Sequence, residues 1–224
     1  DRLELPRGFG ASVTGGTDLT LTEALDLSLR NLTLNLGGNA LAGAADIALG
    51  GDVPRINAQL NAGALDLSHF ASADSGWSKS AIDASALALA NGEVALIADS
   101  INLGDLKLGK TRSLMTLDRA RAVFELRELR AYDGLITGQF VANNRSGLSV
   151  GGTLKVSDIN LERFLTDAAG ITRFAALGSG EVEFLGVGNS VDAIMRSLSG
   201  KGALRTGRGV ISGFDLDRLM RAGD

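Results

Sequence analysis

The chain of 224 residues contains no cysteine, and only 4 % of its residues are aromatic. Without cysteine it forms no disulfide and offers no thiolate to a metal ion. The aromatic content is too low for the base-stacking platforms of single-strand nucleic-acid binders or for the aromatic girdles of outer-membrane barrels. With a formal net charge of −4, the chain also lacks the basic surface that nucleic-acid binding requires. We therefore expect no nucleic-acid partner.

Long hydrophobic runs are also missing. No stretch approaches the roughly 20 apolar residues that a membrane-spanning helix needs. The opening residues, DRLELPRG, lack the parts of a signal peptide. We expect any anchor or signal to precede Asp1 in a longer parent protein. The 45 % hydrophobic content is nevertheless high enough for a core, which leucine, alanine, valine and isoleucine must form.

What the chain has in abundance is alternation of apolar and polar residues, interrupted by 30 glycines. Leucines occupy odd positions from 19 to 29 and even positions from 32 to 36, so we expect a bulge or break at Arg30 and Asn31. The alternation recurs over residues 41–49, 56–60, 87–96, 120–126 and 148–156. Turn signals are Gly37-Gly38, Asn91-Gly92, Asp133-Gly134 and Gly151-Gly152. Short strands separated by glycine turns predict a mainly β fold.

Three short segments have the spacing of amphipathic helices instead. In the first, residues 158–169, Asp158 or Asn160 is the expected N-cap. Residues 190–199 have an apolar stripe and end before Gly200. The stripe consists of Val191, Ile194, Met195 and Leu198. A glycine-rich hairpin and a helix at 215–221 are expected to follow. Residues 116–132 fit either a helix or a strand, and we predict a strand.

A short motif, an apolar residue followed by Asp or Asn and then leucine, recurs at four places. It occupies residues 65–67, 101–103, 159–161 and 214–216. The spacing between copies is too uneven for a solenoid repeat. We interpret the motif as a strand exit, in which the Asp or Asn side chain satisfies backbone N–H groups where the strand ends.

Candidate catalytic features are few. Residues 104–111 match the letters of a phosphate-binding loop, GxxxxGK[ST], but the leucines around them continue a strand, and no helix is expected to open there. His69 is the only histidine, so neither a pair of histidine ligands nor a Ser-His dyad with a spare is available. Trp77, the only tryptophan, is expected to fill a junction between loop and sheet. We expect that the chain is not an enzyme and that it binds no cofactor, metal ion or nucleotide.

The C-terminal region, GSGEVEFLGVGNSVDAIMRSLSGKGALRTGRGVISGFDLDRLM, resembles the C-terminal region of AsmA-family proteins. There a strand, a short helix with a Leu-Ser-Gly-x-Gly turn, and a Gly-x-Ile-x-Gly-x-Asp-Leu segment follow one another. Upstream, WSKSAIDASALALANGEVALIADSINLGDLKLGK, LRAYDGLITGQFVANN and LKVSDINLERFL are similar to the preceding strands of that family. The resemblance covers approximately residues 66–220.

The resemblance implies a periplasmic protein of outer-membrane biogenesis, anchored in the inner membrane by an N-terminal helix that this chain lacks. We expect residues 1–224 to form a single elongated domain, a fragment of a longer protein. The expected fold is an extended, curved or U-shaped antiparallel sheet with an apolar concave face and two or three short amphipathic helices. That face could line a groove for lipids or form an ordinary packed core, and the sequence alone leaves both open.

The function that we predict is non-enzymatic lipid binding or lipid transfer, with phospholipids or other membrane lipids as partners. The alternative is a structural or assembly factor that docks outer-membrane or inner-membrane proteins through its sheet edge. The residues predicted to line the lipid groove are Leu25, Leu27, Leu29, Leu32, Leu34, Leu60, Leu87, Leu89, Leu96, Phe124, Leu126, Leu148, Val150 and Leu154. The stripe of residues 190–199 is predicted to pack on the sheet.

Overall fold

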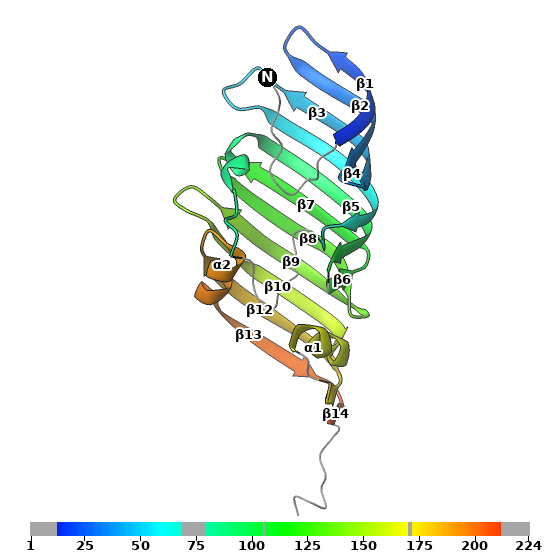
Figure 1. The fold of residues 1–224 in the computed structure, drawn as a ribbon, viewed down its shortest axis with the longest axis vertical. Coiled ribbons are helices and arrows are strands. Elements are labelled where there is room, and N and C mark those ends of the chain that lie inside the picture. The colour runs from blue at the N-terminus through cyan, green and yellow to red at the C-terminus, as the bar shows by residue number, and fades with distance from the viewer. Residues whose placement is uncertain (1–12, 69–78, 105, 170–171, 212–224) are drawn as a thin grey trace, which may run out of the picture.

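The computed structural model describes residues 13–68, 79–104, 106–169 and 172–211. One open, curved sheet of twelve strands runs the length of this part of the chain (Figure 1). Its strands are β1 (Val13–Leu21), β2 (Asp26–Leu36), β3 (Asn39–Ala48), β4 (Arg55–Asp66), β5 (Asn91–Leu103), β6 (Leu106–Leu108), β7 (Thr111–Asp118), β8 (Arg121–Ala131), β9 (Gly134–Asn143), β10 (Ser149–Asn160), β12 (Leu177–Val187) and β13 (Ser199–Thr206). The predicted mainly β fold is confirmed.

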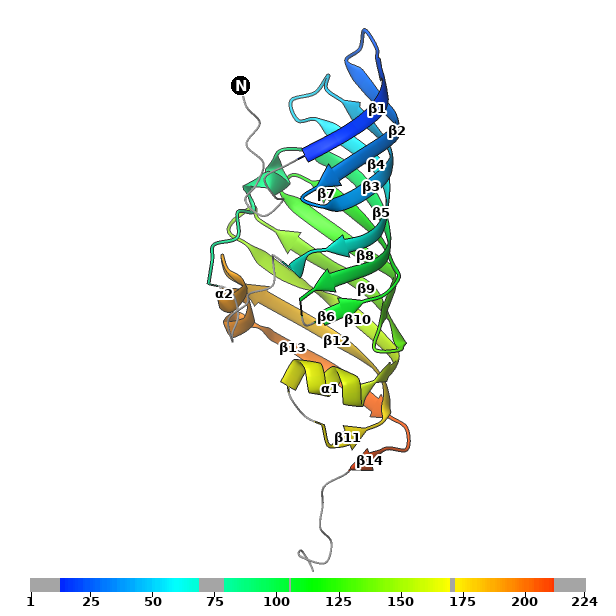
Figure 2. The same ribbon diagram turned by 45° about the vertical axis from the view of Figure 1, so that its right-hand side comes forward.

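Two helices and a small second sheet accompany the large sheet. They are α1 (Leu161–Ala169), α2 (Val191–Ser197) and the pair β11 (Phe174–Ala175) and β14 (Val210–Ile211). A 3-10 helix spans Ser85–Ala88. Both helices stand on the same side of the sheet, at opposite ends of its strands (Figures 1 and 2). No helix in the described ranges is long and apolar enough to cross a bilayer.

Neighbouring strands are antiparallel except β4 and β5, which are parallel. Two rims of the sheet follow from this topology. The rim where β10 ends and α1 begins also holds the ends of β2, β4, β5 and β8, and we call it the α1 rim. The α2 rim, where β12 ends, also holds the ends of β3, β7 and β9. The connection from β4 to β5 must return from the α1 rim to the α2 rim.

The predicted bulge in the first leucine-rich stretch is confirmed. The pairing of β2 with β3 shifts between Leu29 and Leu32, and Asn31 has a φ of 50°. The extra residue keeps the leucines on both sides of it on one face of the sheet. Similar shifts occur after Leu126 in β8 and after Val156 in β10.

The recurring Asp or Asn motif ends three strands at the α1 rim, as interpreted from the sequence. The side chain of Asp66 accepts a hydrogen bond from the amide of Ser68 at 2.9 Å. Asn102 accepts one from the Gly104 amide at 3.1 Å. The side chain of Asn160 caps α1 by accepting the Arg163 amide at 3.2 Å. Each contact satisfies a backbone N–H where strand pairing stops.

Several local predictions are wrong. Leu87 lies in the 3-10 helix and Leu89 follows it, so neither belongs to a strand. Asn91-Gly92 opens β5 and makes no hairpin, because β5 pairs with the parallel strand β4. Gly151-Gly152 lies inside β10, where a Cβ on Gly152 would meet the backbone of the neighbouring residue Phe140. These glycines therefore allow the neighbouring strands to approach closely and do not form a turn.

The C-terminal prediction needs a similar correction. Gly200 does not end the helix, because β13 begins at Ser199. β13 pairs with β12 and β14 with β11, so the expected hairpin between them does not form. Residues 116–132 form the end of β7, the turn at Arg119 and Ala120, and β8 up to the turn at Tyr132, which confirms strand over helix for this stretch. The predicted helix at 215–221, His69 and Trp77 lie outside the described residues.

The bulge at Asn31 gives a first test of the fold. A β-branched residue tolerates positive φ poorly, at a cost of about 1–2 kcal/mol. We expect Asn31→Val to lower the free energy of unfolding by this amount in urea titrations. Asn31→Gly, which loses the same 2.7 Å hydrogen bond to Asp18, should lose less. Equal losses in the two variants would contradict the assigned backbone conformation.

Candidate functional site

One face of the sheet is apolar from the first strand to the last, and we call it the apolar face. It is defined by residues that lie directly opposite one another on successive strands. One such row contains no polar residue: Leu19, Leu29, Ala45, Ala58, Val94, Met115, Phe124, Phe140, Gly152, Phe184 and Gly200. The row crosses eleven strands in the order of the sheet.

The parallel rows on either side of it are almost equally apolar. One contains Leu27, Ile47, Ile56, Gly92, Leu117, Ala122, Ala142, Val150 and Gly186. Toward the α1 rim, the next row includes Leu32, Leu60, Leu96, Leu126, Leu154 and Val182. Ser113 and Thr111 interrupt the rows on β7. Thr111 is buried and donates to the Gly109 carbonyl at 3.1 Å, so its hydroxyl is satisfied.

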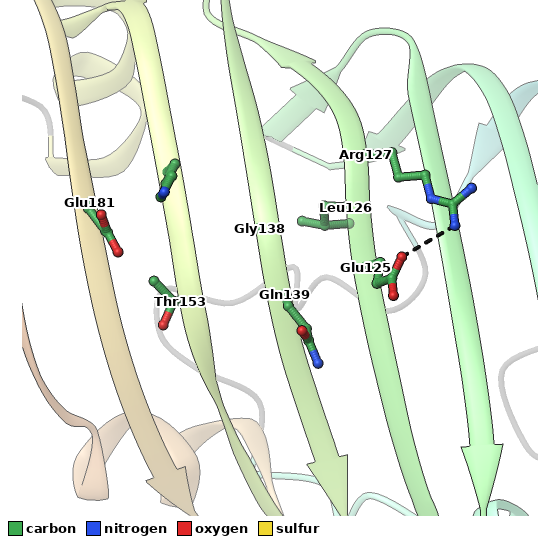
Figure 3. A pocket seen from close by; sticks show the side chains of 8 residues that line it. Glu125, Leu126, Arg127, Gly138, Gln139, Thr153 and Glu181 are labelled. Carbon is green, nitrogen blue, oxygen red and sulfur yellow. Dashed lines mark hydrogen bonds and ion pairs between the residues drawn. The ribbon is translucent and has the colours of Figure 1, made fainter.

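The opposite face of the sheet is polar. A hollow on it is lined by Glu125, Arg127, Gln139, Thr153 and Glu181, among others (Figure 3). Arg127 and Glu125 form an ion pair at 3.3 Å, and both side chains are largely exposed. Exposed pairs of this kind contribute little to stability. The polar face therefore has the character of an ordinary solvated sheet surface.

The apolar face has walls at both rims. At the α1 rim, Leu103 and Leu108 pack on a buried cluster that includes Ala62, Ala98 and Ile101. At the α2 rim, α2 packs on β12, where a Cβ on Gly186 would lie 2.8 Å from Ile194. Residues 79–90 join this wall, since the amide of Ile82 donates to the Asn189 carbonyl at 2.7 Å.

The predicted packing helix is therefore docked, but loosely. Val191, Ile194 and Met195 are half-buried, whereas Leu198 is 44 % exposed. Ser190 caps the helix by accepting the Ala193 amide at 3.1 Å, and Arg196 pairs with Asp192 at 2.8 Å. The Arg196 guanidinium donates a hydrogen bond to the Asp192 carboxylate and carries the opposite charge, and so holds the pKa of Asp192 below its usual value.

A second layer of structure does not cover the apolar face in the described part of the chain. None of the large side chains there is fully buried. Leu19 and Leu204, at the two ends of the sheet, are 60 % and 61 % exposed. A closed core would bury such residues almost completely. The apolar face is therefore largely open between its two walls.

A cavity of about 420 Å³ lies beneath α1, where the apolar face is covered. Its floor comes from β8 to β13 and its sides from β6 and α1. The apolar side chains that line it include Leu106, Leu108, Ile136, Val156, Phe164 and Leu204, and the exposed Leu204 lies at its open side. Glu181 borders it, but the register places that side chain on the polar face, opposite Lys155.

Contacts from the turn between β8 and β9 hold α1 over this cavity. The Arg163 guanidinium donates to both carboxylate oxygens of Asp133, at 3.0 and 2.9 Å. The rings of Tyr132 and Phe164 meet edge to face with centroids 5.4 Å apart. Burial and the nearby Asp167 carboxylate, which accepts a hydrogen bond from the phenol, raise the pKa of Tyr132.

The structure brings together most of the residues predicted to line a groove. Those on the apolar face are Leu27, Leu29, Leu32, Leu34, Leu60, Leu96, Phe124, Leu126, Val150 and Leu154. Leu25 lies in the turn before β2, with a φ of 63°. Leu148 is buried just before β10. Leu87 and Leu89 lie outside the strands, as described above. That these side chains contact lipid stays a prediction.

The sequence reasoning missed other members of the apolar face. Phe140 and Phe184 lie in the central row, and Phe140 stacks on Phe124 with centroids 4.6 Å apart. Both occupy alternating positions in their strands, so the period of two was a sufficient signal. Tyr132 and Leu204 had no such signal, because only the tertiary fold brings them to the cavity beneath α1.

In a comparison with protein families, the model of the AsmA family matches residues 25–224. The matched range includes every described strand from β2 onward, both helices and the cavity beneath α1. No curated protein and no solved structure matches the chain.

The contact between α1 and Tyr132 can be tested by titration. Tyr132 is the only tyrosine, so phenolate absorbance reports its ionisation alone. We expect its midpoint above the ordinary value of 10.0 in the folded chain. Asp167→Asn removes the nearby negative charge and should lower the midpoint, although burial keeps it above that of the unfolded chain. A midpoint that Asp167→Asn leaves unchanged would show that α1 is not held over Tyr132.

Proposed function

The chain belongs to the AsmA family, and from this premise we propose that it is a non-enzymatic module that binds and transfers membrane lipids, with its apolar face shielding the acyl chains. The observation that carries the proposal is the continuous apolar face, which spans the sheet from β1 to β13 and is largely open to a ligand. Family membership is consistent with a bridge-like role in lipid transfer related to the outer membrane.

The free energy of transfer from water favours an acyl chain on the apolar face. Each methylene of a lipid that leaves water for an apolar surface contributes about 0.8 kcal/mol. Exposed leucines such as Leu19 and Leu21 gain from the same contact, because water now covers more than half of each. The walls at the two rims leave the long axis of the apolar face, across the strands, as the direction along which a chain can lie.

The compartment is part of the proposal. We place the protein in the periplasm, within a parent protein that an N-terminal helix holds in the inner membrane. Phospholipids are the partners we propose. This placement and these partners are those that the resemblance to the AsmA family implies.

Site-specific photo-crosslinking in living cells tests the lipid-binding function. Benzoylphenylalanine replaces Leu96 or Phe124, two central residues of the apolar face, in the full-length parent protein. We expect both positions to crosslink phospholipid, which mass spectrometry of the digested protein identifies.

The matched controls are Ala95 and Val123, which precede these residues on the same strands and therefore face the opposite way. We expect these positions to give at least about tenfold less lipid adduct, a difference of roughly 1.4 kcal/mol in binding terms. Equal labelling of the two faces, or no labelled lipid at any position, would refute the proposal.

A second candidate function is supported by the edge strand β13. All eight of its residues are exposed, and it is the last strand of the sheet in the described ranges. An edge strand offers unpaired backbone groups to which a partner protein adds a strand. Docking of an outer-membrane or inner-membrane assembly protein there is the structural alternative to lipid transfer.

Hydrogen exchange separates this alternative from lipid transfer. Addition of a partner that docks by strand pairing should slow exchange of the β13 amides, while the amides of β9, in the middle of the sheet, stay unchanged. Candidate membrane-assembly proteins that leave β13 exchange unaltered would count against docking at this edge.

A further inference from the structure

We propose that the cavity beneath α1 is a discrete binding site for a single acyl chain, with α1 as its cover. This inference rests on the proposed lipid function but goes beyond it. Lipid on the open apolar face can occupy many positions, whereas this cavity offers one defined position. Its occupancy is therefore expected to saturate at one chain per protein.

The shape of the cavity selects a single hydrocarbon chain. Its floor crosses from β8 to β13, which are four strand spacings apart, or about 19 Å. If the volume of about 420 Å³ is spread evenly over this length, the space open to the centres of ligand atoms is on the order of 5 Å wide. Carbon atoms pack at about 3.5–4.0 Å from one another, so this width suits one extended chain better than two.

The lining selects an uncharged ligand. Leu106 and Leu108 of β6 form one wall, and Phe164 and Leu165 of α1 form the cover. Tyr132 supplies the one hydroxyl on the lining, and that group is engaged with Asp167. A volume of a few hundred Å³ with an apolar lining is typical of small-molecule sites. An acyl chain meets both requirements, whether it comes from a free fatty acid or from a phospholipid.

The cover is held by contacts that a ligand can displace. The ion pair between Arg163 and Asp133 is exposed on both sides, at 63 % and 61 %, and such pairs contribute at most about 1 kcal/mol. Phe164 is itself 38 % exposed despite its contact with Tyr132. The buried anchor of α1 is Leu161, next to the Asn160 cap. An acyl chain can therefore displace the Phe164 ring while Leu161 stays buried.

A cavity-filling substitution isolates this site. Gly202 lies on the floor, in the exposed edge strand, and a Cβ there would be 3.2 Å from the nearest atom, the Glu181 carbonyl oxygen. Gly202→Leu fills the cavity at the cost of this tight contact, which a shift of a few tenths of an ångström in the edge strand relieves. Gly207→Leu is the matched control, because a Cβ on Gly207 meets nothing within 4 Å and that residue does not line the cavity. Leu204→Trp, on the same edge strand, fills the cavity independently.

The experiment uses the full chain, purified without detergent, and palmitate that carries a photoactivatable diazirine. We expect saturable labelling at one palmitate per chain, with modified peptides from α1, the end of β8 and β13. Gly202→Leu and Leu204→Trp should reduce labelling at least tenfold, and Gly207→Leu should leave it unchanged. A second arm supplies the diazirine on phosphatidylglycerol in vesicles. Labelling of the same peptides in either arm supports the site and identifies the source of the chain.

Two outcomes would overturn the inference. If labelling spreads along the whole apolar face, or if both filling variants label like the unsubstituted chain, the cavity is not a discrete site, although the proposed lipid function stands. If neither probe labels any part of the apolar face, both the site and the lipid function fail.

Discussion

The register between strands is the constraint on which the rest of this structure depends. Side chains alternate strictly along a strand, so a slip of one residue between neighbours would turn an entire apolar set toward water. Here the register holds over eleven successive strands and produces a row without a polar residue, from Leu19 to Gly200. Because the sheet has a single layer, its two chemically distinct faces follow directly from this pairing.

Along some strands, the residues that point to the apolar face change from odd to even numbers or the reverse. These changes are concentrated in strands that run toward the α1 rim. In β2, β8 and β10 a bulge shifts the apolar positions by one, as from Leu126 to Leu129. In β4 and β5 the buried residues change parity together, and Ala98 and Ile101 meet in one cluster. Bulges bend strands and increase their twist. The wall at the α1 rim is thus formed by the strand ends themselves, by β6, and by α1 after the Asn160 cap.

Among the described residues, no second layer lies over much of the apolar face, which distinguishes this sheet from a sandwich. Two sheets packed face to face bury their inner side chains almost fully, at a spacing of about 10 Å. Here the covered places are the rims, and the cavity beneath α1 is one of them. Exposed leucines on such a face carry a hydration cost that a ligand, a membrane or another chain can remove.

The sequence by itself determined the mainly β class, the bulge at Asn31, the strand exits at Asp66, Asn102 and Asn160, and the family. Each depends on neighbours a few residues apart in the chain. Neighbouring residues alone left residues 116–132 ambiguous between helix and strand, because the bulge in β8 places Leu126 and Leu129 at helical spacing. They also predicted a turn at Gly151-Gly152, although these glycines allow β10 to pair closely with its neighbours. Only the tertiary structure decided that the apolar face is largely open among the described residues, that β5 lies parallel to β4, and that α1, β6 and β13 border a cavity. These features join residues far apart in sequence, and alternation alone states which residues share a face but not what covers it.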